Sequence, residues 1–252
     1  MTWDLRLGSC LDPLTGLASL ADGSVDVTIT DPPYEAEAHA KGMRTKKDIG
    51  SSGPGVVSSP LPFAAITQWD RMSMAREICR VTRRWILVFC QVEASPLWRM
   101  ALEAGDAEYI RTMVWVKPDA QPQLTGDRPG MGYESIVVAH RPGRKRWNGG
   151  GKCGVFDFNK NGRHGAAGAP HPTTKPLPLM RELVSLFSNP GETVLDVCAG
   201  SGSTGVACNQ LGRNFLGWEL DETYFGIAQR RLNGDEARPQ PEQPGLFDVV
   251  TA

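Results

Sequence analysis

Six consecutive apolar residues, WILVFC at positions 85–90, restrict the fold more than any other stretch. A strand formed by this run offers no polar face to water, so it has to be covered on both sides. Strands of this kind belong to mostly parallel sheets that carry helices on both faces. The run therefore predicts an α/β protein with a doubly wound sheet.

Strand and helix patterns alternate along the rest of the chain, as a doubly wound sheet requires. Further strands are expected at residues 25–30, 109–116, 134–140, 193–198 and 215–220, and helices at 63–81, 96–104, 177–188, after AGSGSTG to about 212, and 221–232. In the helix at 63–81, an apolar face is expected from Ile66, Trp69, Met72 and Cys79. The pattern predicts a single domain over residues 1–234, with a mobile or functional loop at 35–62 and a disordered, proline-rich tail at 235–252.

The overall composition excludes some classes of protein without naming a function. The chain has 252 residues and a formal net charge of -1, so any nucleic-acid contact has to come from local basic patches. Its six cysteines are scattered without a CxxC pair, which favours reduced thiols and predicts no metal site. Neither a secretory signal nor a long apolar run is present, and the expectation is a cytoplasmic protein with no membrane partner.

The segment TVLDVCAGSGSTG predicts a glycine-rich turn between a strand and a helix. Such a turn lets a ligand approach the backbone closely. Glu219 follows Gly200 by nineteen residues and ends the next strand, where an acid can accept hydrogen bonds from ribose hydroxyls. The pattern does not complete the G-x-G-x-x-G of an NAD site, and S-adenosylmethionine, which carries no phosphate, fits it better. The alternative is a tight turn with no ligand.

DPPY at 31–34, HPTTKP at 171–176 and LDVCAGSGSTG at 195–205 together resemble the DNA amino-methyltransferases, which methylate N6 of adenine or N4 of cytosine. The motif order resembles the circularly permuted β class of that family, and the resemblance covers residues 3–232. It implies a Rossmann-like methyltransferase fold, mostly parallel with one antiparallel strand, and S-adenosylmethionine as cofactor. It also implies double-stranded DNA as substrate and a homodimer.

The resemblance also implies which residues surround the cofactor. Two of them depart from the family pattern: Cys198 replaces a usual aromatic residue, and Ser9 stands in the lead-in strand where an acid often contacts the adenine ring. The implied cofactor-binding residues are Ser9, Cys10, Asp31, Thr173, Thr174, Lys175, Asp196, Cys198, Ala199, Gly200, Ser201, Gly202 and Glu219.

The Asp31-Pro32-Pro33-Tyr34 corner is the expected catalytic apparatus. The lone pair of an exocyclic amino group is delocalised into the base ring, and acceptors on its two N–H bonds localise it. Asp31 supplies one acceptor, and the rigid Pro-Pro pair fixes the Pro32 carbonyl as the other. Tyr34 can stack on the base, which has to be flipped out of the duplex. A strand-ending turn is the structural alternative for this motif.

Two basic segments are expected to contact DNA beyond the flipped base. The first belongs to the loop after the catalytic corner, and the second opens a variable recognition segment at 141–170. Their basic residues are Lys41, Arg44, Lys46, Lys47, Arg141, Arg144, Lys145, Arg146 and Lys152. A solvated basic loop is the alternative for each residue of the second segment.

Within the family, DPPY accompanies adenine more often than cytosine, so the motif favours N6 of adenine over N4 of cytosine. Methylation of RNA or of a protein glutamine is a further alternative, as is a catalytically inactive DNA-binding module. Gln243, Leu246 and Phe247 resemble the Q-x-x-L-F peptides that dock on bacterial sliding clamps, although a free or self-packed tail is favoured.

Overall fold

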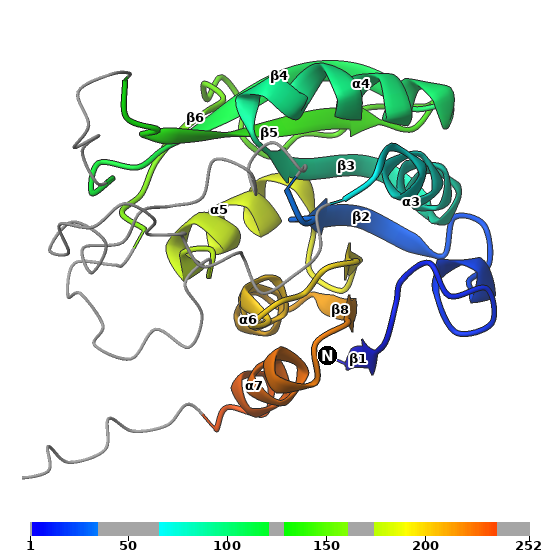
Figure 1. Cartoon of the computed structure of the whole chain (residues 1–252). Helices are drawn as coiled ribbons and strands as arrows, with labels where there is room; N and C mark the ends of the chain where they lie inside the picture. Colours follow the sequence, from blue (N-terminus) through cyan, green and yellow to red (C-terminus); the bar gives the residue numbers. More distant parts are fainter. Residues whose placement is uncertain (1, 35–65, 121–128, 161–173, 236–252) are drawn as a thin grey trace, which may run out of the picture.

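The computed structural model describes residues 2–34, 66–120, 129–160 and 174–235. Eight strands form one sheet in the order β1-β8-β7-β2-β3-β5-β4-β6 (Figure 1). The strands are β1 Trp3–Leu7, β2 Val25–Thr30, β3 Thr82–Cys90, β4 Glu108–Val116, β5 Tyr133–His140, β6 Val155–Asp157, β7 Thr193–Asp196 and β8 Asn214–Glu219. The helices are α3 Gln68–Val81, α4 Ser95–Ala104, α5 Leu177–Phe187, α6 Ser203–Leu211 and α7 Glu222–Leu232, with single 3-10 turns η1 Leu17–Ser19 and η2 Val92–Ala94.

The directions of the strands define two opposite edges of the sheet. β5 runs antiparallel to both of its neighbours, β3 and β4, whereas all other adjacent strands are parallel. The carboxyl ends of the seven parallel strands therefore share one edge with the start of β5, and we call it the carboxyl edge. The opposite side is the amino edge. This topology confirms the expected α/β sheet with a single antiparallel strand.

Helices cover both faces of the sheet, which explains the apolar run in β3 (Figure 1). Trp85, Leu87 and Phe89 point into a core shared with α5, α6 and α7. Ile86, Val88 and Cys90 point into a second core, shared with α3 and α4. Each side chain from 85 to 90 is at most 4% exposed, so the strand is buried on both sides as expected.

Several boundaries differ from those that the sequence predicts. α3 begins only at Gln68, because Thr67 and Asp70 form a reciprocal capping box. Trp69 lies in the first turn of α3 and is 81% exposed, so its expected place on the apolar face was wrong. β1 ends at Leu7, and Ser9 therefore follows the lead-in strand and is not part of it. β6 has only three residues, too few for a pattern to mark. Within the described ranges, no helix is long and apolar enough to cross a membrane.

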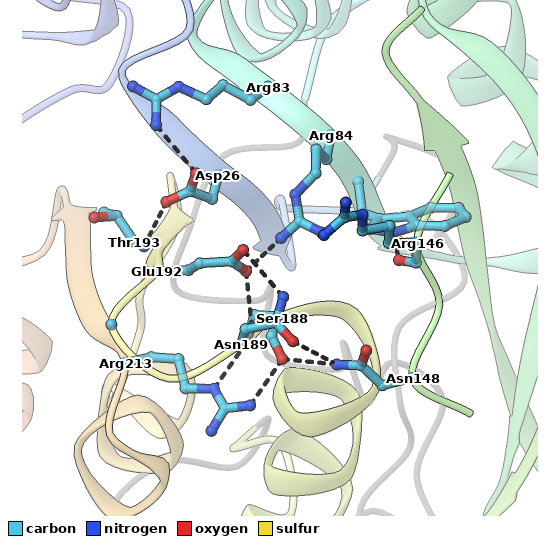
Figure 2. Close-up of polar contacts among 12 residues, drawn as sticks. Asp26, Arg83, Arg84, Arg146, Asn148, Ser188, Asn189, Glu192, Thr193 and Arg213 are labelled. Carbon is cyan, nitrogen blue, oxygen red and sulfur yellow. Dashed lines mark hydrogen bonds and ion pairs between the residues drawn. The ribbon is translucent and has the colours of Figure 1, made fainter. Parts of the chain in front are cut away.

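A polar network closes the amino edge (Figure 2). Arg84 of β3 pairs with Glu192, whose carboxylate also accepts hydrogen bonds from Asn189 N at 2.7 Å and Asn189 Nδ2 at 3.1 Å. Arg213 donates to Ser188 Oγ and to the Ser188 carbonyl. The same carbonyl accepts from Asn148 Nδ2 at 3.0 Å. We call this set the amino-edge network; its members are Asp26, Arg83, Arg84, Asn148, Ser188, Asn189, Glu192, Thr193 and Arg213.

Candidate active site

A cavity of about 590 Å³ opens at the carboxyl edge, next to the ends of β1, β2, β7 and β8. Ligands of doubly wound sheets bind at this edge, because loops of neighbouring strands diverge there. Of the predicted site residues, the cavity is lined by Ser9, Cys10, Asp31, Pro32, Pro33, Tyr34, Thr174, Lys175, Asp196, Cys198, Ala199, Gly200, Ser201 and Glu219. Thr173 lies outside the described residues.

The glycine-rich turn after β7 has the backbone geometry that only glycine adopts readily. Gly200 has φ +54°, and a Cβ added to it would meet nothing within 4 Å, so this backbone is open to a ligand. Gly202, with φ +78°, serves a different purpose: its missing side chain leaves room for Ala228 of α7, and it does not line the cavity. The sequence predicts a cofactor contact at both glycines, and the structure brings only Gly200 to the cavity wall.

Two acids fix the shape of this turn from inside. Glu219 Oε2 accepts a hydrogen bond from Gly200 N at 2.7 Å, and its Oε1 accepts one from Asp221 N at 2.8 Å. Asp196 accepts bonds from Thr204 Oγ1 at 2.6 Å and Cys198 N at 3.1 Å. Burial raises the pKa of Asp196 to about 6, although both hydrogen bonds favour its ionised form. Burial likewise raises the pKa of Glu219.

Two cysteines form an apolar part of the cavity wall. Cys10 follows β1 and Cys198 follows β7, and both line the cavity. The contact with Cys10, together with burial, raises the pKa of the Cys198 thiol well above its usual value. Cys198 therefore presents a neutral thiol, and both cysteine side chains pack as small hydrophobic groups. Ser9 is turned to the local backbone, where its Oγ accepts a hydrogen bond from Leu11 N at 3.2 Å.

Asp31, directly after β2, is held from one side only. Lys175 Nζ lies 2.5 Å from Asp31 Oδ2. Asp31 Oδ1 is buried and has no hydrogen-bond partner among the described residues. A buried acceptor without a partner costs about 1–3 kcal/mol, and native proteins retain few of them. The carboxylate therefore has one oxygen anchored by Lys175 and one whose hydrogen-bonding capacity is unused among the described residues.

Lys175 and Tyr34 lead to two further charged residues that sequence reasoning missed. Glu134, at the start of β5, accepts a hydrogen bond from Tyr34 Oη at 2.9 Å. Lys117, just after β4, donates to Glu134 Oε1 at 2.5 Å. Lys175 Nζ lies 3.2 Å from Glu134 Oε2 as an ion pair. The sequence does place a base just after one strand and an acid at the start of the next. This pattern becomes informative only once β5 is known to be antiparallel, because the two side chains then lie at the same edge.

Burial and mutual attraction control the protonation of this group. Burial raises the pKa of Asp31, and the Lys175 ammonium opposes that shift. Burial alone would lower the pKa of Lys175, but the carboxylates of Asp31 and Glu134 outweigh it and raise that pKa well above its usual value. Burial alone would raise the pKa of Glu134, but Lys175 and Lys117 bring it down to about 2. Lys175 and Glu134 are thus charged at neutral pH.

The basic residues predicted to contact DNA fall in different places. β5 runs from the carboxyl edge to the amino edge, because Ser135 pairs with Cys90 and His140 with Trp85. The segment that follows His140 therefore starts at the amino edge. Arg141 donates to the carbonyls of Gly105 and Asp106 there. Four of the predicted DNA contacts belong to this segment, and none of them lines the cavity: Arg141, Arg144, Lys145 and Arg146.

The remaining basic residues differ again. Lys145 Nζ pairs with Glu108 at 2.6 Å, and Trp85 Nε1 donates to the Arg146 carbonyl at 2.6 Å, which fixes this stretch of chain. Lys152 pairs with Glu182 of α5 and does not line the cavity. Beyond it, β6 carries the chain back to the carboxyl edge, where Lys160 N donates to Asp119 Oδ1 at 2.7 Å. Gln243, Leu246 and Phe247 lie outside the described ranges, as do four of the residues predicted to contact DNA: Lys41, Arg44, Lys46 and Lys47.

Comparisons with known proteins agree with this geometry. The family model of the N6/N4 methyltransferases, described as DNA methylase, matches residues 25–230. A curated relative, the type II methyltransferase M2.DpnII of Streptococcus pneumoniae, is 25% identical over 256 residues and covers 89% of this chain and 88% of its own length.

Solved structures show the same fold. The M1.HpyAVI complex with S-adenosylmethionine superposes with a TM-score of 0.68 at 23% identity, over 92% of this chain and all of that one. The PvuII methyltransferase, named as cytosine-N4-specific, gives a TM-score of 0.65 at 14% identity, over 93% of this chain and 94% of its own. Because the family model spans most of the sequence, including Asp31–Tyr34 and the glycine-rich turn, the chain belongs to the N6/N4 family of DNA methylases.

Proposed function

We propose that this DNA methylase transfers a methyl group from S-adenosylmethionine to N6 of an adenine flipped out of double-stranded DNA. The observation that carries the proposal is the arrangement at Asp31. One carboxylate oxygen is anchored by Lys175, and the other is buried without a partner at the wall of the cavity. An unused acceptor in that position matches an amino group that has two N–H bonds to donate.

The residues present fit S-adenosylmethionine. Glu219 stands at the end of β8 with lone pairs left for ribose hydroxyls, and Gly200 leaves its backbone open beside it. The cavity of about 590 Å³ lies within the usual size for a cofactor of this kind. When bound, this cofactor supplies an electrophilic methyl group on a sulfonium. The rest of the proposal concerns what the chain's own residues do.

Asp31 and Pro32 are proposed to activate the target nitrogen by hydrogen bonding. Asp31 Oδ1 accepts one amino N–H and the Pro32 carbonyl accepts the other, which localises the nitrogen lone pair. Pro33 supports this arrangement because the Pro-Pro sequence restricts the backbone that carries the carbonyl. No covalent enzyme intermediate is needed, so catalysis consists mainly of in-line positioning. The transferred methyl replaces one amino proton, which leaves through Asp31 to water.

Tyr34 is proposed to stack on the flipped base. Its hydroxyl is already tied to Glu134 at 2.9 Å, so its ring is oriented before the base arrives. Stacking of this type is worth about 1–3 kcal/mol per base. It helps to offset the cost of extracting the base from the duplex, a few kcal/mol.

The DNA is proposed to approach the carboxyl edge. Ile66 N donates to the Tyr34 carbonyl at 3.2 Å, so the basic segment between these two residues starts and ends beside the catalytic corner. Its four basic residues are therefore our proposed phosphate contacts: Lys41, Arg44, Lys46 and Lys47. The group at residues 141–146 starts at the other edge, and its predicted role in DNA binding has no geometric support from the cavity.

The choice of adenine rests on the DPPY sequence alone, because adenine and cytosine enzymes of this family share the fold. A transfer assay decides it: purified protein is incubated with methyl-labelled S-adenosylmethionine and DNA from a strain without methyltransferases. The DNA is then digested to nucleosides and separated by chromatography. The expected labelled product is N6-methyldeoxyadenosine. N4-methyldeoxycytidine would overturn the base assignment, and unlabelled DNA would overturn the proposed function.

A further inference from the structure

Glu134 is the point at which three parts of the catalytic region meet. Glu134 is only 8% exposed. Its Oε1 accepts hydrogen bonds from Lys117 Nζ at 2.5 Å and from Tyr34 Oη at 2.9 Å. Its Oε2 faces Lys175 Nζ at 3.2 Å without hydrogen-bond geometry. The residue does not line the cavity, and the proposed chemistry uses it only as the partner of the Tyr34 hydroxyl.

We infer that Glu134 is a positioning residue for methyl transfer, which shares the Lys175 ammonium with Asp31 and anchors the Tyr34 ring. This inference rests on the proposed function, because it concerns the same reaction. Glu134 acts through Lys175 and Tyr34 and does not itself touch the base. Its partners come from three separate segments, so a single side chain at the start of β5 ties the ends of β2 and β4 to the residues before α5.

Charge sharing explains why Asp31 remains a strong acceptor. Two carboxylates, Asp31 and Glu134, face two ammonium groups, Lys117 and Lys175, so the buried cluster is neutral as a whole. If Lys175 paired with Asp31 alone, the positive charge of its ammonium would stabilise the negative charge of that carboxylate only. Asp31 Oδ1 would then be a weaker acceptor for the target amino group. Glu134 prevents this by holding the ammonium between both acids.

The other groups around Lys175 are aromatic. Its Nζ lies 5.0 Å from the ring centroid of Phe89 and 6.0 Å from those of Tyr34 and Trp115. Aromatic faces attract a cation but accept no proton. Among the described residues, the titratable groups that set its protonation are therefore Asp31, Glu134 and the Tyr34 hydroxyl, with Lys117 acting through Glu134.

The anchoring of Tyr34 is the second part of this role. A phenol hydroxyl bonded to a carboxylate forms a charge-assisted bond, which is stronger than a neutral one. The ring is thereby fixed at two points, by its backbone after Pro33 and by its hydroxyl at Glu134. Without the second point, Tyr34 keeps its ring but loses its orientation toward the base.

Steady-state kinetics with labelled cofactor test the inference on Glu134→Gln, which keeps the side-chain size and removes the charge. We expect kcat to fall by about 10–100-fold, the usual effect of losing an outer partner of a site residue, while KM for S-adenosylmethionine changes less than about twofold. Glu103→Gln, on the surface of α4, is the matched control and should leave both constants unchanged. An unchanged kcat in Glu134→Gln would overturn the inference.

A second measurement needs neither substrate nor turnover. The Lys175 ammonium is followed through pH by NMR of the protein labelled with 15N at lysine Nζ, and Lys175→Met assigns the signal. In the wild type, this signal should persist well above the usual titration range of lysine, and in Glu134→Gln its pKa should drop. An ordinary pKa for Lys175 in the wild type would overturn the inference even if Glu134→Gln failed to fold. A wild type that transfers no methyl to DNA would instead disprove the proposed function.

Discussion

Charged side chains gather at both edges of the sheet, but the two edges use them differently. At the amino edge, the side chains of the amino-edge network bond to one another and to the backbone (Figure 2). Arg84, for example, pairs with Glu192, and Glu192 also accepts a hydrogen bond from Asn189. At the carboxyl edge, Asp31 Oδ1 has no partner in the described part of the chain, and its residue lines a cavity. Both edges have polar residues beside the ends of buried strands, so charge alone does not distinguish them.

The difference teaches that unmet hydrogen-bonding capacity marks the site better than charge does. A closed network stabilises the fold and has nothing to offer a ligand, whereas an open one costs stability until a ligand completes it. His140 Nε2 is a counterexample at the amino edge, since it is buried and also lacks a partner among the residues that the structure describes. It lies far from the cavity, however, at the end of β5 that pairs with Trp85. The criterion therefore needs both an unused polar atom and an opening.

The largest expected effect comes from removing the open acceptor itself. Asp31→Ala should reduce kcat by about 10³-fold or more, because it deletes a preorganised electrostatic contact to the reacting group. The dissociation constant for S-adenosylmethionine, measured by calorimetry without DNA, should change less than about threefold, since Glu219 and Gly200 remain. Asp22→Ala, at an exposed surface pair with Arg80, is the control. A loss confined to cofactor affinity would contradict the proposed role of Asp31.

A second test asks whether the carboxyl edge carries a measurable stability cost. Asp196 has its pKa raised from 3.8 to about 6, so between these values the folded protein holds a proton that the unfolded chain has released. Stability from this group is present below pH 4 and is lost as pH rises through 6. The total loss is at most about 3 kcal/mol, at 1.36 kcal/mol for each unit of pKa.

Urea unfolding at a series of pH values measures this cost. Asp196→Asn should lose the dependence that wild type shows between about pH 4 and 7, because the neutral amide has no proton to release. The difference between the two curves isolates Asp196 from Asp31, whose pKa is also raised. Parallel curves would show that Asp196 is not strained by burial and that this part of the edge is as relaxed as the other.

The sequence allowed much of the fold and part of the site to be predicted, and the failures share one cause. WILVFC, DPPY and the glycine-rich turn are local patterns, and each was found where its residues predicted. A role for Glu134 and Lys117 can be inferred only once the end of β4 and the start of β5 are known to lie at the same edge. Likewise, residues 141–170 look like one variable segment, but β6 carries the described part, residues 141–160, from the amino edge to the carboxyl edge. Strand direction is a tertiary property, and no short pattern encodes it.

A third test concerns the closed edge. Glu192→Gln should lower the free energy of unfolding by about 1–3 kcal/mol, because it removes the charge that pairs with the partly buried Arg84 guanidinium. Glu103→Gln, from an exposed pair with Arg99, should cost less than about 0.5 kcal/mol. Both variants should keep the wild-type kcat and cofactor affinity. A catalytic defect in Glu192→Gln at full folding would mean that the two edges are coupled.

The smallest expected effect is the sharpest test of which edge meets DNA. Each phosphate contact contributes about 0.9 to the slope of log affinity against log salt. Replacing Arg144, Lys145 and Arg146 together by glutamine should change that slope by less than about one, because this group starts at the amino edge and Lys145 already pairs with Glu108.

The matched variant replaces Lys41, Arg44 and Lys46 by glutamine. It should reduce the magnitude of the negative slope by about two or more. Fluorescence anisotropy of a labelled duplex over a range of salt concentrations gives both slopes, and the equal charge change makes them directly comparable. The reverse result would place the duplex against the amino edge. The flipped base would then have to reach Asp31 across the full length of the strands, about 20 Å at 3.3 Å per residue over a six-residue strand such as β2. That distance is why we expect the DNA at the carboxyl edge.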